Sequence, residues 1–205
     1  LDGLVGSEMC IETVAKHTCT AGGLQRFHSV RNGLSALPRT VVLIAVHDGV
    51  RPLVSSDLIL ETVECAAAHG TAIPVVEAVD SLRQLTPDGS HPIDRNTLRI
   101  VQTPQVFDAE LLRRAYELDY SPDFTDDASV VERAGHAVTL CHGERGNLKI
   151  TTADDLPIAE AFFYPEHPVK KIYKYSFSRH TLSLTTIYLT IFLLSLIHIS
   201  EPTRP

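Results

Sequence analysis

The 205-residue sequence lacks the arrangements of cysteine and histidine that usually hold structural or catalytic metals. Its four cysteines, at positions 10, 19, 65 and 141, form no CxxC pair, and its ten histidines form no HxH or HExxH motif. These absences argue against a zinc site. No signal peptide is recognisable either, so we expect a protein of the reducing cytosol. The four thiols are expected to be free and buried.

The sequence also has little positive charge to offer to an anionic partner. Its formal net charge of -7 argues against nucleic acid or an anionic membrane as the main partner. The charge is unevenly spread, because five of the 18 basic residues and only one of the 25 acidic ones lie from His167 onward. The body before it is therefore near -11 and the tail near +4.

The tail from residue 167 to 205 differs in character from the rest. Leu182–Ile199 is nearly uncharged and about long enough to cross a bilayer, which is typical of a tail anchor. The end of the chain, LIHISEPTRP, resembles translated sequencing-adapter read-through. We therefore expect a non-native or disordered tail with no membrane role, and keep the anchor as the alternative.

The stretch Val41–Pro52, VVLIAVHDGVRP, is the centre of the predicted fold. A short apolar run without alternation is typical of a strand buried on both faces, as in parallel sheets. Such a strand ends at the edge where open α/β proteins bind ligands, and here it ends at Asp48, three residues before Arg51. Asp is a metal ligand and Arg a phosphate clamp, although an ordinary loop ion pair explains this stretch alone equally well.

Elements on both sides of this strand alternate between helix and strand, which predicts an α/β fold with a mainly parallel sheet. Helices are expected over 26–37, 55–69, 108–118, 128–134 and 153–163, and strands over 71–76, 137–141 and 148–151. Residues 78–101 read as a hairpin arm that projects from the sheet. An exposed arm usually needs a partner, so we expect a symmetric homodimer.

Four polar clusters lie at predicted strand ends or helix starts. They are Gly22-Gly23 with Arg26 and Ser29; His47-Asp48 with Arg51; Asp94-Arg95 with Thr103; and Lys149 in a segment after a glycine-flanked loop. Each is weak alone: the glycine pair suits an ordinary turn and the lysine a solvated surface. Asp126-Asp127 is explained most simply as a helix cap.

Together these clusters supply Lys, Arg, Asp and hydroxyl groups, with no Ser-His-Asp or Cys-His arrangement. This set is typical of phosphoryl or nucleotidyl transfer, in which positioning and charge neutralisation do most of the catalysis.

Six segments in order resemble one enzyme family: GGLQRFHSVRNGL (22–34), VHDGVRP (46–52), IPVVEAVDSL (73–82), DRNTLRIVQTPQVFDAELLRRAY (94–116), FTDDASVVE (124–132) and NLKITTADDLPIAE (147–160). The family is that of 2-C-methyl-D-erythritol 4-phosphate cytidylyltransferase, of non-mevalonate isoprenoid biosynthesis, and the resemblance covers about residues 20–163. It implies a Rossmann-like nucleotidyltransferase fold, a homodimer with exchanged arms, and Mg²⁺-dependent transfer of CMP from CTP to the sugar-alcohol phosphate, with release of pyrophosphate. A cytoplasmic location is expected from the cysteines and the lack of a signal peptide.

The resemblance also implies roles for individual residues. The cytidine pocket of CTP would be lined by Gly22, Gly23 and Ser29, with Asp48 holding Mg²⁺ beside the substrates. The methylerythritol phosphate would be bound by Arg51, Thr103, Thr125 and Lys149, and by Ser81 and Arg95 from the arm of a second copy. Asp48, Arg51 and Lys149 would be the catalytic residues.

Two departures from the family pattern bear on activity. The family begins with a strand and a Gly-rich loop whose Arg and Lys wrap the CTP triphosphate, and residues 1–20 contain no match to it. We therefore expect residues 1–166 to form a cytidylyltransferase domain without these first units, and the chain as given to be inactive or nearly so. Gly146 stands where many members carry an acidic residue, so the resemblance supplies no second metal ligand.

The alternatives are a ribitol-5-phosphate cytidylyltransferase, whose motifs are similar, and a catalytically inert dimeric binding module.

Overall fold

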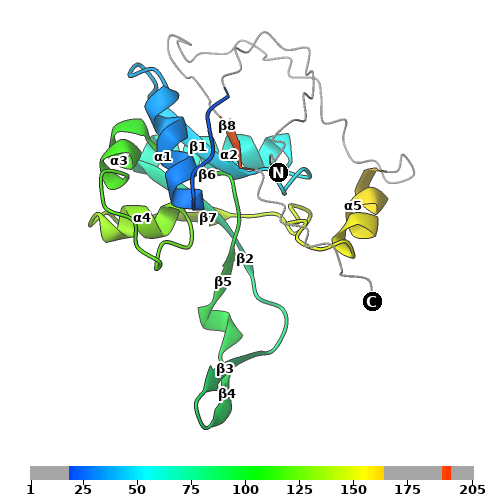
Figure 1. Cartoon of the computed structure of the whole chain (residues 1–205). Helices are drawn as coiled ribbons and strands as arrows, with labels where there is room; N and C mark the ends of the chain where they lie inside the picture. The colour runs from blue at the N-terminus through cyan, green and yellow to red at the C-terminus, as the bar shows by residue number, and fades with distance from the viewer. Residues whose placement is uncertain (1–18, 164–190, 195–205) are drawn as a thin grey trace, which may run out of the picture.

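The computed structural model describes residues 19–163 and 191–194. The elements of its body (Figure 1) are α1 (Arg26–Ala36), β1 (Leu43–Asp48), α2 (Ser56–His69), β2 (Thr71–Glu77), β3 (Leu82–Thr86), β4 (Gly89–Ile93), β5 (Arg99–Val101), β6 (Gln105–Asp108), α3 (Ala109–Ala115), α4 (Asp127–Arg133), β7 (Leu140–His142) and α5 (Asp155–Phe163). A 3₁₀ turn, Arg95–Thr97, precedes β5, and Ile191–Leu194 forms β8.

The central sheet has the strand order β5-β2-β6-β1-β8, with β7 paired to β2. Among the described strands, β1, β2, β7 and β8 run in one direction, and β5 and β6 run antiparallel to their neighbours. The expected α/β fold with a mainly parallel sheet is confirmed. The strand β6, which lies between β1 and β2, was not predicted, because four residues between a turn and a helix cap give too short a pattern to recognise.

The strand β1 is buried on both faces, as its unbroken apolar run predicts. Its alternate side chains enter two cores. Ile44 and Val46 pack on the side of α1, α3 and α4, whereas Leu43 and Ala45 pack on the side of α2. The sheet is therefore a middle layer between helices, and β1 delivers Asp48 to the edge of that layer.

Helix ends follow the predicted capping residues. Ser55 accepts the Leu58 N–H and Asp108 accepts the N–H groups of Glu110 and Leu111, while Gly70 ends α2 with a φ of 82° that favours glycine. The helix expected over 108–118 is shorter, since α3 ends at Ala115. The strand expected over 148–151 is wrong: this segment is irregular and is tied to the body by the Ile150 N–H, which donates to the Val50 carbonyl at 2.8 Å.

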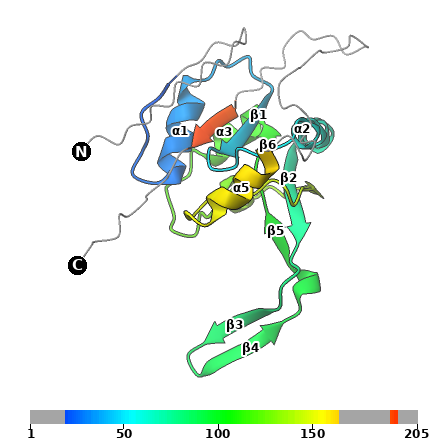
Figure 2. The same ribbon diagram turned by 90° about the vertical axis from the view of Figure 1, so that its right-hand side faces the viewer.

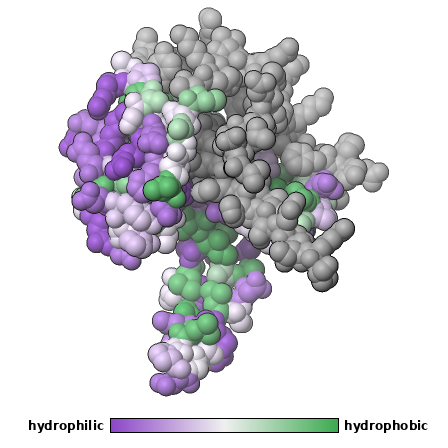
Figure 3. Space-filling view, viewed as in Figure 1, coloured by the Kyte–Doolittle hydropathy of each residue, from purple (hydrophilic) through white to green (hydrophobic). Residues whose placement is uncertain are grey.

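The predicted arm is present. The strands β3 and β4 form an antiparallel hairpin that projects from the body on a stem made by the ends of β2 and β5 (Figure 2). Apolar side chains gather along this stem (Figure 3), where Val79, Ile100 and Val101 are exposed. The tail prediction falls largely outside the described residues; β8, its one described part, pairs parallel with β1. No helix among the described residues is both long and apolar enough to span a membrane.

The cysteines differ from the expectation of uniform burial. Cys19 is exposed, Cys65 and Cys141 are half-buried beside the core that faces α2, and Cys10 lies outside the described residues. Burial and the neighbouring Cys65 thiol raise the pKa of the Cys141 thiol to about 11, so Cys141 is expected to be chemically inert.

We predict that Cys141 is alkylated by iodoacetamide at pH 8 about 100-fold more slowly than a thiol with the ordinary pKa of 9.0, because its thiolate fraction is smaller by that factor. Peptide-resolved mass spectrometry over a time course measures the rate, with the urea-denatured chain as the control. Alkylation of Cys141 as fast as that of Cys19 would contradict the prediction.

Candidate functional site

Three cations surround the Asp48 carboxylate at the end of β1. The Nζ of Lys149 and the Nε of Arg51 lie 3.3 and 3.4 Å from its Oδ2, and the Nε of Arg26 lies 3.8 Å from its Oδ1. Burial raises the pKa of Asp48, but the charges of Lys149, Arg26 and Arg51 outweigh this effect and lower the pKa below its usual value. Asp48 is therefore an ionised carboxylate, only 9% exposed.

The Asp48 backbone is fixed by a buried polar chain. Its N–H donates to Thr103 Oγ1 at 3.0 Å, and Thr103 Oγ1 lies 3.0 Å from His47 Nδ1. His47 Nε2 lies 3.1 Å from the Arg51 carbonyl, which only accepts, so Nε2 carries the proton and Nδ1 accepts from Thr103. Burial lowers the pKa of His47, which agrees with this neutral form. Thr103, in the segment between β5 and β6, thus holds the end of β1 at Asp48.

Arg51 ties three segments together at the site. Besides Asp48, its guanidinium donates from Nη1 to the Asn147 carbonyl at 2.8 Å and from Nη2 to the Val101 carbonyl at 3.4 Å. Burial lowers the pKa of Arg51 and Asp48 opposes the change. The side chain is 9% exposed, so its position is set by the fold.

The loop before Lys149 is held by amide groups. The side chain of Asn147, fully buried, donates from Nδ2 to the Thr103 carbonyl at 2.8 Å, and its Oδ1 has no hydrogen-bond partner in the part of the chain that the structure describes. The Gln102 side chain donates to the Glu144 carbonyl at 2.8 Å and accepts the Glu144 N–H at 3.1 Å. These bonds place Lys149, whose side chain is 48% exposed, at the Asp48 carboxylate.

Gln102 and Thr103 reach the site because the pairing with β2 is interrupted between β5 and β6. The strands β5 and β6 both run antiparallel to β2, and the Gln102 N–H continues the pairing by donating to the Pro74 carbonyl. The ladder breaks at Thr103-Pro104, where the side chain of Thr103 turns to the end of β1. Such interruptions re-aim side chains next to binding sites.

The first predicted cluster forms a closed turn at the start of α1. The Gly23 N–H donates to Ser29 Oγ at 2.9 Å, and Ser29 Oγ donates to the Gln25 carbonyl at 3.4 Å. A Cβ on Gly23 would lie 2.3 Å from the His28 Cβ, so this position requires glycine. Gly22 is exposed beside it.

The structure brings together Asp48, Arg51, Thr103 and Lys149, all of which were predicted to lie in the site. Thr125 is exposed just before α4, with its N–H donating to Ser129 Oγ at 3.1 Å. Ser81 and Arg95 lie on the arm, where Arg95 donates to the Val79 carbonyl. Within one copy, the arm residues and the Asp48 cluster belong to different parts of the molecule (Figure 2).

Sequence reasoning missed the amide groups of Gln102 and Asn147 and the partner of Arg26. The Arg26 Nη2 donates to the buried Asp127 at 2.5 Å, 101 residues away, and no local pattern signals such a pair. Asp126 is the N-cap of α4, as expected, and also accepts from Gln105 Nε2 at 2.7 Å. In residues 19–163 and 191–194 no cluster of three His, Cys, Asp or Glu side chains is arranged for a metal.

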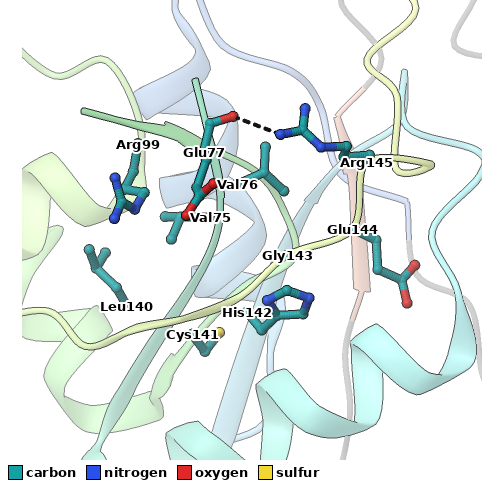
Figure 4. Close-up of a pocket in the computed structure, with 10 residues that line it drawn as sticks. All are labelled: Val75, Val76, Glu77, Arg99, Leu140, Cys141, His142, Gly143, Glu144 and Arg145. Atoms are coloured by element: carbon teal, nitrogen blue, oxygen red, sulfur yellow. Dashed lines mark hydrogen bonds between the residues drawn. The ribbon is translucent and has the colours of Figure 1, made fainter. Parts of the chain in front are cut away.

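A hollow of about 730 Å³ lies beside β2, β5, β7 and residues 143–145 (Figure 4). It is lined by Glu77, His142 and Arg145, and Arg145 donates to the Glu77 carbonyl at 3.3 Å. None of the four convergent residues lines it. The candidate site is the cluster around Asp48, not this hollow.

Comparison with known proteins gives a consistent result. A sequence model of the 2-C-methyl-D-erythritol 4-phosphate cytidylyltransferase family matches residues 6–164, which begins earlier than the expected resemblance. Curated proteins of that name from Bacteroides fragilis and Porphyromonas gingivalis are 51% and 46% identical over 146 and 145 residues, or 71% and 70% of this chain. The chain spans 66% and 65% of their lengths.

Solved structures agree. A crystal structure of 2-C-methyl-D-erythritol 4-phosphate cytidylyltransferase from Thermus thermophilus aligns with a TM-score of 0.63 at 36% identity, covering 70% of this chain and 72% of that one. The enzyme of that name from Francisella tularensis aligns with a TM-score of 0.61 at 32% identity, covering 68% and 69%. The similarity therefore extends through the body that carries the Asp48 cluster.

Proposed function

We propose, because this chain belongs to the 2-C-methyl-D-erythritol 4-phosphate cytidylyltransferase family, that its site serves CTP-dependent transfer of CMP to 2-C-methyl-D-erythritol 4-phosphate in isoprenoid precursor biosynthesis. The observation that carries the proposal is the convergence of Lys149 and Arg51 on Asp48 at the end of β1. This set of charges suits a reaction that joins two phosphates.

In the proposed reaction an oxygen of the substrate phosphate attacks the α-phosphorus of CTP. A phosphorus–oxygen bond forms there while the bond from the α-phosphorus to the β-phosphate oxygen breaks, and pyrophosphate leaves with the electron pair. Lys149 and Arg51 would hold the attacking phosphate and offset its charge. The half-exposed Lys149 is free to turn toward this ligand, whereas Arg51 is fixed by two backbone carbonyls.

The Asp48 carboxylate fits a magnesium ion that takes most of its other ligands from substrate phosphates and water. Mg²⁺ often takes one or two protein carboxylates and completes its shell with phosphate oxygens and water, and Asp48 supplies one ionised carboxylate. When bound, the ion would neutralise charge on the CTP phosphates. Within the described part of the chain Asp48 would be its protein ligand.

Other residues would complete the substrate sites. The closed turn of Gly22, Gly23 and Ser29 would border the cytidine, since it presents backbone groups at a helix start. Thr125 and Thr103 would lie on the sugar-alcohol side, Thr103 mainly by fixing the Asp48 loop.

Ser81 and Arg95 would reach the site from the arm of a second copy. A homodimer built on the arms is supported by the exposed apolar residues of the stem, which a partner would cover. A cytoplasmic location is supported by the free thiols of Cys19, Cys65 and Cys141.

The proposal is tested first by binding, because binding depends on residues that the structure describes. Calorimetric titration of the 205-residue chain with 2-C-methyl-D-erythritol 4-phosphate is expected to give saturable binding that Lys149→Ala weakens about tenfold, through loss of a charged phosphate contact. Arg145→Ala, in the same loop but outside the cluster, is the matched control. Pyrophosphate release with CTP and Mg²⁺ is the second readout.

The outcomes separate the alternatives. Equal binding by wild-type and Lys149→Ala chains would reject the assigned site. Tighter binding of ribitol 5-phosphate would indicate the related substrate. Binding of neither sugar-alcohol phosphate would favour an inert binding module, and pyrophosphate release at a normal rate would overturn the expectation that this chain is inactive or nearly so.

A further inference from the structure

Arg26 lies between two carboxylates that belong to different parts of the fold. It is the first residue of α1, and its Nη2 donates to the Oδ2 of Asp127, the first residue of α4, at 2.5 Å. Its Nε lies 3.8 Å from the Oδ1 of Asp48, the last residue of β1. One guanidinium thus connects the first turns of two helices with the strand end that carries the candidate site.

The Asp127 end of this connection is fixed. The Asp127 side chain is fully buried, and its second oxygen accepts the Tyr116 hydroxyl at 2.5 Å. Removing one partner from a buried charge pair is strongly destabilising, so the Arg26–Asp127 contact stays closed in the folded protein. Burial opposes the charge of Arg26, but Asp127 outweighs it and raises the pKa of Arg26 above its usual value. Arg26 is therefore a cation that its bond to Asp127 holds in place.

The three cations do not share Asp48 equally. Arg51 and Lys149 approach Oδ2, whereas Arg26 alone approaches Oδ1. A phosphate bound by Lys149 and Arg51 would compete with Oδ2 for the Lys149 ammonium and for Arg51 Nε. Arg26 has no such freedom, because Asp127 holds its other edge.

We infer that Arg26 is a positioning residue, which Asp127 and Tyr116 anchor so that its Nε edge keeps the Asp48 carboxylate in place while Lys149 and Arg51 engage the substrate phosphate. This inference rests on the proposed function for the identity of that phosphate. The competing explanation is that the Arg26–Asp127 pair only ties α1 to α4, with no effect on Asp48.

The geometry is tested without any ligand. In the ¹⁵N-labelled chain the Arg26 Nε–Hε signal, identified by its loss in Arg26→Lys, is expected to shift in Asp48→Asn, because Nε faces that carboxylate. Arg133→Gln, which removes the exposed Arg133–Asp123 pair (3.1 Å) at the far end of α4, is the control and is expected to leave the signal unmoved. An Arg26 signal that Asp48→Asn does not shift would overturn the inference.

The functional consequence is tested by a double-mutant cycle. Arg26→Gln alone strands a buried carboxylate, so it is combined with Asp127→Asn, which leaves two amides and no buried charge. This pair of replacements is expected to weaken binding of 2-C-methyl-D-erythritol 4-phosphate about tenfold when Asp48 is present. In the Asp48→Asn background the same pair is expected to weaken binding less than about twofold, because the effects of residues that act through one another are not additive. Arg26→Lys is expected to restore little of the lost affinity, since one ammonium does not reach both Asp48 and Asp127.

The same loss of affinity in both backgrounds would mean that Arg26 acts through the fold and not through Asp48, which overturns the inference. Absence of binding by the wild-type chain would instead count against the proposed function. The ligand-free signal of Arg26 would still decide the inference in that case.

Discussion

Replacing Arg51 by lysine is expected to weaken the binding of 2-C-methyl-D-erythritol 4-phosphate by about 100-fold, although the charge is kept. The guanidinium places three nitrogens on Asp48 and on the carbonyls of Asn147 and Val101, and a single ammonium does not satisfy all three. The buried Asn147 carbonyl would keep only its longer bond from Gln102 Nε2 (3.4 Å), so the free energy of unfolding is also expected to fall by about 1 kcal/mol. Calorimetric titration and urea denaturation measure the two effects.

The matched control is Arg99→Lys. Arg99 is exposed at the start of β5, and its guanidinium donates to the carbonyls of Asn96 and Leu98 and not to the Asp48 cluster, so both quantities are expected to stay near their wild-type values. If Arg51→Lys binds the substrate within threefold of wild type, charge alone explains the role of Arg51. The three-segment tie would then have no bearing on the site.

The parts of the fold that sequence predicted are those with local causes. An unbroken apolar run gave β1, and Ser55 and Gly70 marked both ends of α2, because capping depends on residues within one turn. The short β6 was missed and a strand over 148–151 was wrongly expected. In both places four residues carry too little periodicity, and the outcome is set by long-range contacts such as that of Ile150 with Val50.

The candidate site divides in the same way. Asp48 and Arg51 are three residues apart at a strand end, so their proximity follows from the sequence. Lys149 lies 101 positions after Asp48 in the sequence, and the buried amides of Gln102 and Asn147 hold its loop at the site. No spacing rule reveals these contacts. Asp127 likewise bonds with Arg26 of α1 and with Tyr116, the C-cap of α3, whereas a helix cap was the simpler interpretation of its sequence.

Replacing Asp48 by asparagine is expected to change binding and turnover in opposite directions. The carboxylate competes with a substrate phosphate for Lys149 and Arg51, so its neutralisation is expected to strengthen phosphate binding about fivefold. Arg51 would remain in place, because its two carbonyl contacts do not involve Asp48. Any residual release of pyrophosphate by this chain is expected to be lost, since the proposed magnesium ligand is removed.

Asp123→Asn is the matched control, because Asp123 is an exposed carboxylate paired with Arg133 and lies outside the site. It is expected to change neither quantity. Loss of phosphate affinity together with turnover in Asp48→Asn would mean that Asp48 acts mainly by arranging the cations, and the competition argument would fail. Stronger phosphate binding together with lost pyrophosphate release would show that Lys149 and Arg51 bind the phosphate and that Asp48 is needed for the reaction. A single charge change would then have separated binding from turnover.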